Sequence, residues 1–544
     1  MDFRAEVERL NLDPKAFNLI QNLLSSMDDL GRNNATLVSE VAALEQTTVL
    51  LEQSNVALEQ SHTALEQTNT ALEVQNQKLK FEVAHLRRLR FGAKTEAFSA
   101  DQKSLFEDDL GEDIAAVEAL IEAALPAKSR KPRARAGRQP LPEHLLRIEV
   151  RHELESETCP DCQSTLTPIG EDVTEQLDYE PGNFVVRRHI RPKCTCRNCQ
   201  TIIAVPVAPA IIDGGVAAPG LLSWVVTSKY LDHLPLYRIE QIAARQGVML
   251  SRSTMSEWIG RIGVALQPLV DKLHEHLRSR TSLHADETPV RQLDPGKGKT
   301  KNAYLWAYRS NDLDTGPPVV VFEYQTSRSG KHAQSFLKDW QGHLCVDDFS
   351  GYKALFAGGV TEVACWAHAR RKFFDLYAAG GHPVAAEAIE RIGRLYAIER
   401  TAKAFTIEAR QALRSSQAVP ELQSFHDWLT QIRLGTATGS GLAKACDYVL
   451  RRWPSFARYA DTGHLPIDNN RVENIIRPIA IGKKNWLFAG SERAGQRAAA
   501  IQSLLATAKL NGLDPTVWLT ETLEKLPTWP NSRIDELLPF RKSN

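Results

Sequence analysis

The sequence predicts a multidomain protein with an N-terminal coiled coil, a metal-binding module, a helix-turn-helix-like region and a mixed α/β domain that carries a helical insertion. Three observations predict it. Leucine recurs every seventh residue from Leu37 to Leu86, two Cys-x-x-Cys pairs lie between Cys159 and Cys199, and strand-like and helical runs alternate from residue 281 onward. A chain of 544 residues is too long for one compact core, so several domains are expected.

Residues 1–92 are expected to form a helical region with a coiled coil, because a 3.5-residue apolar period winds helices together. With leucine at position d, position a holds Asn55, Asn69 and Asn76, which favours a parallel two-stranded coil. We therefore expect self-association into a dimer or a higher assembly. The alternative is a solvated helix on the protein's own surface. Residues 93–145 read as an acidic and then basic linker.

Residues 146–210 are expected to bind one structural Zn²⁺ ion. Two Cys-x-x-Cys turns offer four thiolates, as a tetrahedral zinc site needs. The predicted ligands are Cys159, Cys162, Cys196 and Cys199. Cys194 is predicted to be a non-ligand, and the alternative is a module that has lost its metal. Clustered cysteines in a chain without an export signal favour a reducing cytoplasm.

Residues 211–275 contain a candidate helix-turn-helix. Residues 237–246 look helical and stop at Gly247, and a second helix is expected to start near Ser251, with Thr254 and Glu257 as a capping pair. A plain αα-hairpin that packs on the next domain explains the pattern equally well.

Residues 276–380 predict the first part of an α/β core. Residues 281–286 read as a short strand that ends in Asp286, two further strands and a helix over 331–340 follow, and the next strand ends in Asp347. This order of elements, with aspartates on the first and fourth strands, is the plan of a ribonuclease-H-like domain. Choosing Asp347 rather than Asp348 rests on the assumed register of the strand.

Glu473 is the predicted third carboxylate, on a helix in the second part of the core, residues 463–510. Asp468 is expected to cap this helix, and Pro478 to end or kink it. Three such carboxylates would hold two Mg²⁺ (or Mn²⁺) ions for phosphoryl transfer. The alternative is a surface ion pair between Glu473 and Arg477. Residues 381–462 read as a helical insertion, and residues 511–544 as a C-terminal tail.

Cationic and aromatic side chains near these carboxylates are expected to contact DNA or shape the site. They are His368, Arg370, Arg371, Lys372, Arg477, Lys483, Lys484 and Trp486. The alternative for the first four is an ordinary cationic face at the end of a helix. Cys365 and His368 have the spacing of half a zinc site, with no second half nearby in the sequence.

These motifs together resemble the insertion-sequence family 66 transposases. The resemblance runs through most of the chain, from Leu86-Arg-Arg-Leu-Arg-Phe-Gly to Asp468-Asn-Asn-Arg-Val-Glu473 and the tail. It implies that Asp286, Asp347 and Glu473 form an Asp-Asp-Glu triad. Asp348 departs from the family, which often has glycine there.

The resemblance and the carboxylates predict a DNA transposase that cleaves the ends of its element and joins 3′-hydroxyls to target DNA. The rivals are a ribonuclease-H-like nuclease without strand transfer and a non-catalytic DNA-binding regulator. Expected partners are double-stranded DNA and accessory proteins of the same element. No membrane span is expected, and the expected location is the bacterial cytoplasm, in association with the nucleoid.

Overall fold

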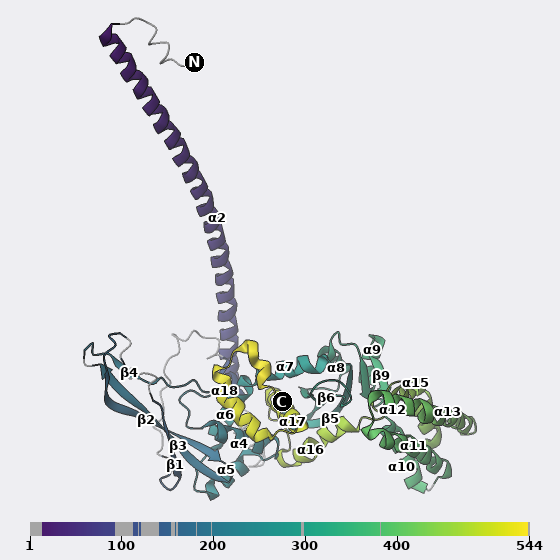
Figure 1. Cartoon of the computed structure of the whole chain (residues 1–544). Coiled ribbons are helices and arrows are strands. Elements are labelled where there is room, and N and C mark those ends of the chain that lie inside the picture. The colour runs from purple at the N-terminus through teal and green to yellow at the C-terminus, as the bar shows by residue number, and fades with distance from the viewer. Residues whose placement is uncertain are drawn as a thin grey trace. The chain divides into compact units, whose positions relative to one another are not determined.

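A computed structural model describes residues 13–92, 112–117, 119–120, 141–153, 158, 161–180, 182–196, 198–294, 299–380 and 382–541. The chain divides into two compact units, Met1–Lys78 and Leu79–Asn544, which are described separately (Figure 1). No helix in the described ranges is long and apolar enough to cross a membrane.

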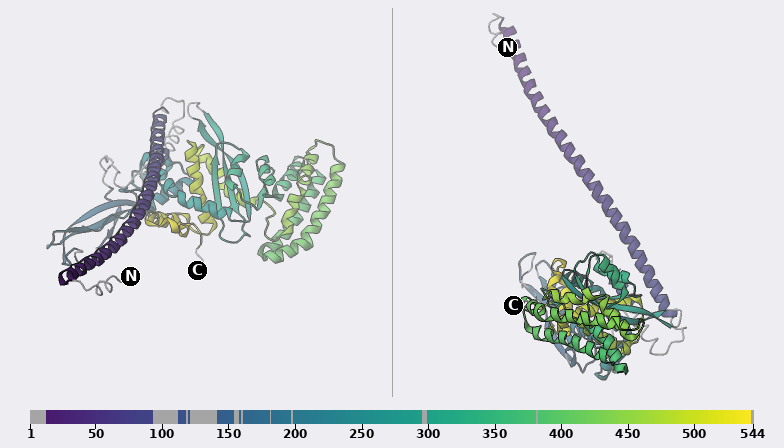
Figure 2. Two further views of the ribbon diagram at one scale, coloured as in Figure 1. Left: turned by 90° about the horizontal axis from the view of Figure 1, so that it is seen from above. Right: turned by 90° about the vertical axis from the view of Figure 1, so that its right-hand side faces the viewer.

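Helix α2, Pro14–Gly92, contains the leucine heptads in one uninterrupted, gently curved helix (Figure 2). Among the heptad leucines whose side chains are described, four are 60–66% exposed, namely Leu44, Leu51, Leu58 and Leu65, whereas Leu79 is buried. An isolated helix of this length with exposed leucines leaves apolar area in water, which a second helix would remove. The coiled coil itself stays a prediction.

The cysteine region forms a small sheet of four strands. These are β1 (Leu146–Arg151), β2 (Leu166–Glu180), β3 (Asn183–Cys196) and β4 (Ile202–Ala204). Their order is β1-β3-β2, and β4 pairs with β3. Strands β2 and β3 form a long antiparallel hairpin. The hairpin brings Cys162, which precedes β2, to the end of β3, where Cys196 lies.

Four helices follow and join the main core. They are α4 (Pro219–Tyr230), α5 (Leu236–Arg245), α6 (Arg252–Ala265) and α7 (Gln267–Arg278). A glycine turn between α5 and α6 was expected, and Gly247 has φ +74°. The expected Thr254 cap is wrong: Ser251 is the N-cap, and its side chain accepts from the Thr254 N–H. Much of α6 is buried, including Trp258 and Ile259, and DNA binding by this helix pair stays a prediction.

The second sheet has five strands in the order β7-β6-β5-β8-β9. They are β5 (Ser282–Asp294), β6 (Lys299–Ser310), β7 (Val320–Gln325), β8 (His343–Val346) and β9 (Thr361–Ala364). Strands β5 to β7 pair antiparallel, whereas β5, β8 and β9 are parallel. Helix α8 (Gly330–Leu337) connects β7 to β8, and η3 (Ser350–Tyr352) and α9 (Lys353–Ala357) connect β8 to β9.

The expectation that the first strand ends at Asp286 is wrong. Strand β5 continues to Asp294, because its pairing with β6 extends as far as Lys299. Only the parallel pairing with β8 stops early, at His284. Asp286 therefore lies just beyond the end of the β5–β8 ladder, in the middle of a long strand.

The predicted helices between the two parts of the core are present and gather beside β9 (Figure 1). They are α10 (Trp366–Gly380), α11 (Pro383–Thr401), η4 (Ala402–Ala404), α12 (Ile407–Leu413), the π-helical η5 (Arg414–Ala418), α13 (Val419–Leu434), α14 (Gly441–Leu450), α15 (Trp453–Ala457) and η6 (Arg458–Asp461). Their core is built around Trp366, Phe373, Phe425 and Phe456, and it also includes Cys345 of β8 and Val363 and Ala364 of β9.

The chain then returns to the second sheet. The last elements are α16 (Asn470–Trp486), α17 (Glu492–Leu510), α18 (Pro515–Lys525), η7 (Leu526–Thr528) and η8 (Asn531–Leu537). Helix α16 packs Val472, Ile476 and Ile479 into a cluster with residues of β5, β6 and β7. Helix α17 covers β7, where the hydroxyls of Ser503 and Thr507 accept from backbone N–H groups of the strand.

We expected α16 to end or kink at Pro478, and an end there is wrong, because the helix continues through this residue to Trp486. Proline removes one backbone donor from a helix interior and crowds the preceding turn. The apolar face of α16 is buried on both sides of Pro478, at Ile476 and Ile479. Burial of this face offsets the local cost of the proline.

A short helical segment from the linker, residues 112–117, packs in the same unit as the sheet. Arg497 on α17 donates to Glu112 at 2.8 Å and to Asp113 at 3.1 Å, and all three side chains are buried. A Cβ atom at Gly260 would meet the Glu112 carbonyl, and one at Gly263 would meet Arg497. These two glycines of α6 therefore make room for the buried charged side chains and their segment of backbone.

Candidate active site

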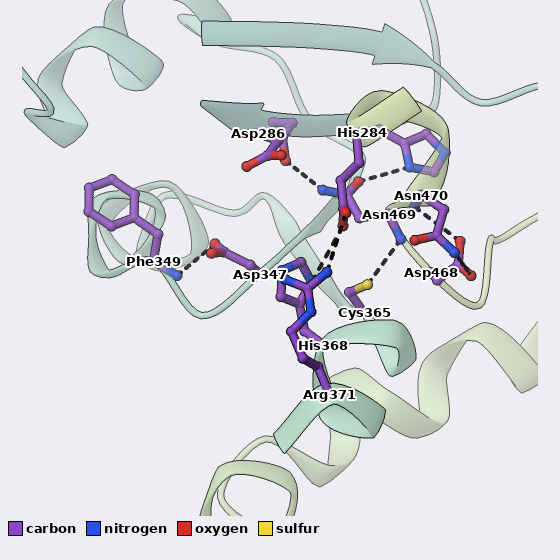
Figure 3. Close-up of polar contacts among 12 residues, drawn as sticks. His284, Asp286, Asp347, Phe349, Cys365, His368, Arg371, Asp468, Asn469 and Asn470 are labelled. Atoms are coloured by element: carbon purple, nitrogen blue, oxygen red, sulfur yellow. Dashed lines mark hydrogen bonds and ion pairs between the residues drawn. The ribbon is translucent and has the colours of Figure 1, made fainter. Parts of the chain in front are cut away.

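Asp286 and Asp347 come from neighbouring parallel strands. In the β5–β8 ladder Leu283 pairs with Leu344 and His284 with Cys345. The same register continued by two residues places Asp286 beside Asp347, and neighbouring residues of a parallel pair face the same side of a sheet. Figure 3 shows the Asp286 and Asp347 side chains.

The electrostatics of Asp286 reflect this crowding. Burial, together with the charges of Glu287, Asp347 and Glu473, raises the pKa of Asp286 to about 7. A backbone N–H from Glu287 donates to its Oδ1 at 2.9 Å and partly opposes the shift. Several carboxylates that repel one another in one place create a site for a cation.

Asp348 does not join this group. Its side chain is 45% exposed and lies 3.7 Å from Arg452. The Asp347 carboxylate instead accepts from the backbone N–H of Phe349 at 2.8 Å, which orients it toward the sheet end. The structure thus brings Asp347, rather than Asp348, to Asp286.

Glu287 faces away from the other carboxylates, as alternation along a strand requires. It accepts from Arg328 at 2.8 Å and from the Tyr352 hydroxyl at 2.8 Å, and its side chain is only 2% exposed. Arg328 also stacks over Phe349, 4.0 Å from the ring centre. Glu287 therefore holds the loop after β8 in place.

Glu473 reaches the site from the first turn of α16. Its Oε1 lies 3.7 Å from His368 Nδ1, and its Oε2 lies 3.8 Å from the Arg371 guanidinium. His368 and Arg371 both belong to α10. The Glu473 side chain is 19% exposed. The expected cap Asp468 is wrong by one residue, because Asn469 is the N-cap of α16. The Asp468 carboxylate lies just before the helix and accepts from the Asn470 N–H at 3.1 Å.

Asn469 fastens this helix end to the sheet. Its Oδ1 lies 3.0 Å from His284 Nδ1, and its Nδ2 donates to the Ala285 carbonyl at 2.8 Å. Its backbone N–H donates to Cys365 Sγ at 3.1 Å, and the residue is only 1% exposed. Figure 3 shows Asn469 between His284 and Cys365. Sequence reasoning missed this role, although Asn469 lies beside the predicted cap.

The predicted DNA-contacting residues fall into two groups. Arg370, Arg371, Lys372, Arg477 and Lys484 are exposed. The others have contacts inside the fold: Lys483 donates to the Pro289 carbonyl at 2.9 Å, Trp486 is partly buried against the core cluster of α16, and His368 lies beside Glu473. Burial also lowers the pKa of Lys483.

Three of the four predicted zinc ligands come together. Cys162 Sγ lies 3.3 Å from Cys196 Sγ and 3.6 Å from Cys199 Sγ. Sulfurs bound to one tetrahedral zinc ion, with Zn–S bonds of about 2.3 Å, would lie at roughly this separation. Cys159 lies outside the described residues, and Cys194 is buried next to β4 and is not part of the group. The cluster supports a structural zinc ion.

Comparison with known families agrees with this layout. Residues 214–497 match the family described as "Transposase IS66 family", and residues 156–200 match "zinc-finger binding domain of transposase IS66". Residues 503–540 match "IS66 C-terminal element", and residues 78–150 match "Transposase C of IS166 homeodomain". These matches define a transposase-type protein. The chain belongs to the IS66 transposase family, as its motifs indicated.

Similar proteins occur in Sinorhizobium fredii. The uncharacterized protein y4jD is 36% identical over 482 residues, which cover 85% of this chain and 94% of that protein. The uncharacterized protein y4qI is 35% identical over 474 residues, which cover 84% and 87%. The similarity therefore extends over nearly the whole architecture.

Proposed function

We propose that this protein is a DNA transposase that cleaves the ends of its own mobile element and joins the freed 3′-hydroxyls to target DNA. Membership of the IS66 transposase family supports the class of activity. The observation that supports the chemistry is the β5–β8 register, which continued by two residues sets Asp286 beside Asp347, together with the effect of the Asp347 and Glu473 charges on the Asp286 carboxyl. The sheet order supports a ribonuclease-H-like core.

The three carboxylates fit Mg²⁺ or Mn²⁺, because both ions prefer oxygen ligands and the group concentrates negative charge. Two such ions would supply activation of the attacking hydroxyl and stabilisation of the leaving oxygen. The side chains do the positioning: two strand aspartates hold one side of the site, and Glu473 closes it from the helix.

DNA would approach over the exposed cations beside the site. Arg370, Arg371, Arg477 and Lys484 are exposed residues, which suits contacts with phosphate groups. Lys483 and Trp486 make interior contacts, which favours a supporting role for both. The exposed leucines of α2 would pair two chains, so that two element ends are handled together.

The test uses the full chain and DNA that carries an element end. Wild-type protein with Mg²⁺ is expected to release a 3′-hydroxyl and then to give a strand-transfer product. Glu473→Gln and Asp347→Asn should each lower cleavage by more than about 100-fold, because even outer-shell partners of metal sites cost ~10–100-fold. Asp348→Asn is the matched control, since its carboxylate faces Arg452.

The outcomes separate the rival functions. Cleavage without any joined product would indicate a nuclease. Element-end binding that is indifferent to Mg²⁺, with no cleavage, would indicate a regulator. Full activity in Glu473→Gln would remove this residue from the triad.

A further inference from the structure

A second cluster of metal-ligand side chains adjoins the three carboxylates. Cys365 lies directly before α10, His368 lies one helical turn further, and Glu473 faces them from α16. One ligand atom from each, Sγ, an imidazole nitrogen and a carboxylate oxygen, lies within 4.8 Å of the other two. The sequence showed the Cys-x-x-His half of this cluster, and the fold adds the third ligand.

The spacing of two of these atoms fits a shared cation better than a direct bond. His368 Nδ1 and Glu473 Oε1 are 3.7 Å apart, which is too long for a hydrogen bond. Two ligands of one tetrahedral ion, at bond lengths of about 2.0–2.2 Å, would be roughly 3.3–3.6 Å apart. Both atoms are buried and have no hydrogen-bond partner. Such atoms are rare in folded proteins, and an ion between them would satisfy both.

The type of ligand selects the metal. A thiolate and an imidazole prefer zinc and related transition metals, whereas Mg²⁺ prefers oxygen ligands alone. We propose that Cys365, His368 and Glu473 form a second zinc site, distinct from the cysteine module. Three protein ligands leave one position of a tetrahedral ion open.

The neighbouring contacts are compatible with this site. The Asn469 N–H donates to Cys365 Sγ at 3.1 Å and orients the sulfur, and metal-bound thiolates accept such bonds. Arg371 lies 3.8 Å from Oε2, so it does not occupy the oxygen that faces His368. Zinc would therefore bind Oε1 of Glu473, and Oε2 would stay beside Arg371. That Glu473 also belongs to a Mg²⁺ site rests on the proposed function, whereas the zinc site itself does not.

Zinc content of the purified full chain tests the proposal without DNA. After loading with Zn²⁺ and removal of excess metal, wild-type protein should hold about two ions per chain, one of them in the cysteine module. Cys365→Ser should hold about one. Cys446→Ser is the matched control, because it removes another buried thiol that is not part of a metal-ligand group, and it should keep both ions.

Replacement by Co²⁺ adds a spectroscopic readout. Wild-type protein should show absorption from a site with one thiolate in addition to that of the cysteine module, and His368→Gln should lose only this component. His368 is half-buried, so this variant guards against a Cys365→Ser protein that fails to fold. Equal zinc content and equal Co²⁺ spectra in wild type, Cys365→Ser and His368→Gln would overturn the site.

The result is independent of the proposed catalysis. Asp286→Asn removes a carboxylate of the Mg²⁺ group but no zinc ligand, so it should keep both zinc ions while losing cleavage. An active wild-type transposase that holds one zinc ion would overturn the second site alone. Two zinc ions in a protein without cleavage would count against the proposed function alone.

Discussion

At the scale of single residues, Asp286 carries the clearest electrostatic signature. Its pKa of about 7 lies above the ordinary value of 3.8, so the folded protein holds this proton more tightly than the unfolded chain does. The group therefore stabilises the metal-free fold at low pH, and this contribution is lost as the pH rises from about 4 to about 7.

Asparagine does not ionise, so Asp286→Asn should remove the loss of folding stability that accompanies ionisation of Asp286 as the pH rises. In metal-free protein, the variant is expected to be more stable than wild type at pH 8, by on the order of 1–4 kcal/mol, with little difference near pH 4. Thermal unfolding across this pH range, in the presence of a chelator, is the measurement. A pH profile for Asp286→Asn that runs parallel to that of wild type would contradict the raised pKa of Asp286.

Asn469 is the second residue of interest, because it joins β5, α16 and the start of α10. Asn469→Ala should destabilise the protein by about 2–3 kcal/mol through two lost side-chain hydrogen bonds. It should also raise the Mg²⁺ concentration needed for half-maximal cleavage by about 10–100-fold, because Glu473 is less firmly placed. Asn470→Ala, next in the chain but exposed, is the control. An unchanged Mg²⁺ requirement would leave Asn469 with a structural role only.

At the scale of elements, α16 shows how packing overrides local preference. Pro478 lies inside this helix and is exposed, so its cost is not offset by contacts of its own ring in the core. Pro478→Ala restores one backbone donor and should stabilise the protein by about 1–3 kcal/mol.

A second proline, Pro515, provides the control for the stability change expected of Pro478→Ala. Pro515 is the first residue of α18, where its fixed φ suits the helix start and its missing N–H costs nothing. Pro515→Ala should therefore give no gain. Thermal or urea unfolding compares the two variants, and a loss of stability in Pro478→Ala would show that the ring itself is needed.

At the scale of the whole molecule, the leucines of α2 predict the assembly state. Leu51→Lys with Leu58→Lys should convert a dimer or higher assembly into a monomer, because charges at position d oppose helix pairing. Light scattering after size-exclusion chromatography measures the mass. Gln53→Lys with Gln60→Lys changes the charge equally at position f, away from the leucines, and should not dissociate the assembly. A monomeric wild-type protein would contradict the coiled coil.

The buried cluster of Arg497, Glu112 and Asp113 belongs to the same scale. It ties the linker segment 112–117 to α17, and burial raises the pKa of Asp113 even though Arg497 opposes this shift. The sequence predicted only a linker there. The available signal was Arg497 directly before three alanines, since a charge on an apolar helix face usually needs a buried partner.

Much of the local structure follows from the sequence alone. The heptad leucines predicted one long helix, and strand-like runs predicted β3 and the second sheet. A series of helical segments predicted the insertion between Asp347 and Glu473. The sequence also nominated Asp286, Asp347 and Glu473 by residue type and position, although their catalytic role remains our proposal. These features depend on periodicity and turn residues, which act over a few neighbouring residues.

Only the tertiary structure decided the contacts that join distant segments. The β5–β8 register selects Asp347 over Asp348, and burial against the sheet carries α16 past Pro478. The fold also brings Glu473 to Cys365 and His368, and Asn469 to His284. No local pattern encodes these pairs, because each depends on how whole elements pack and on which polar groups the packing leaves to be satisfied.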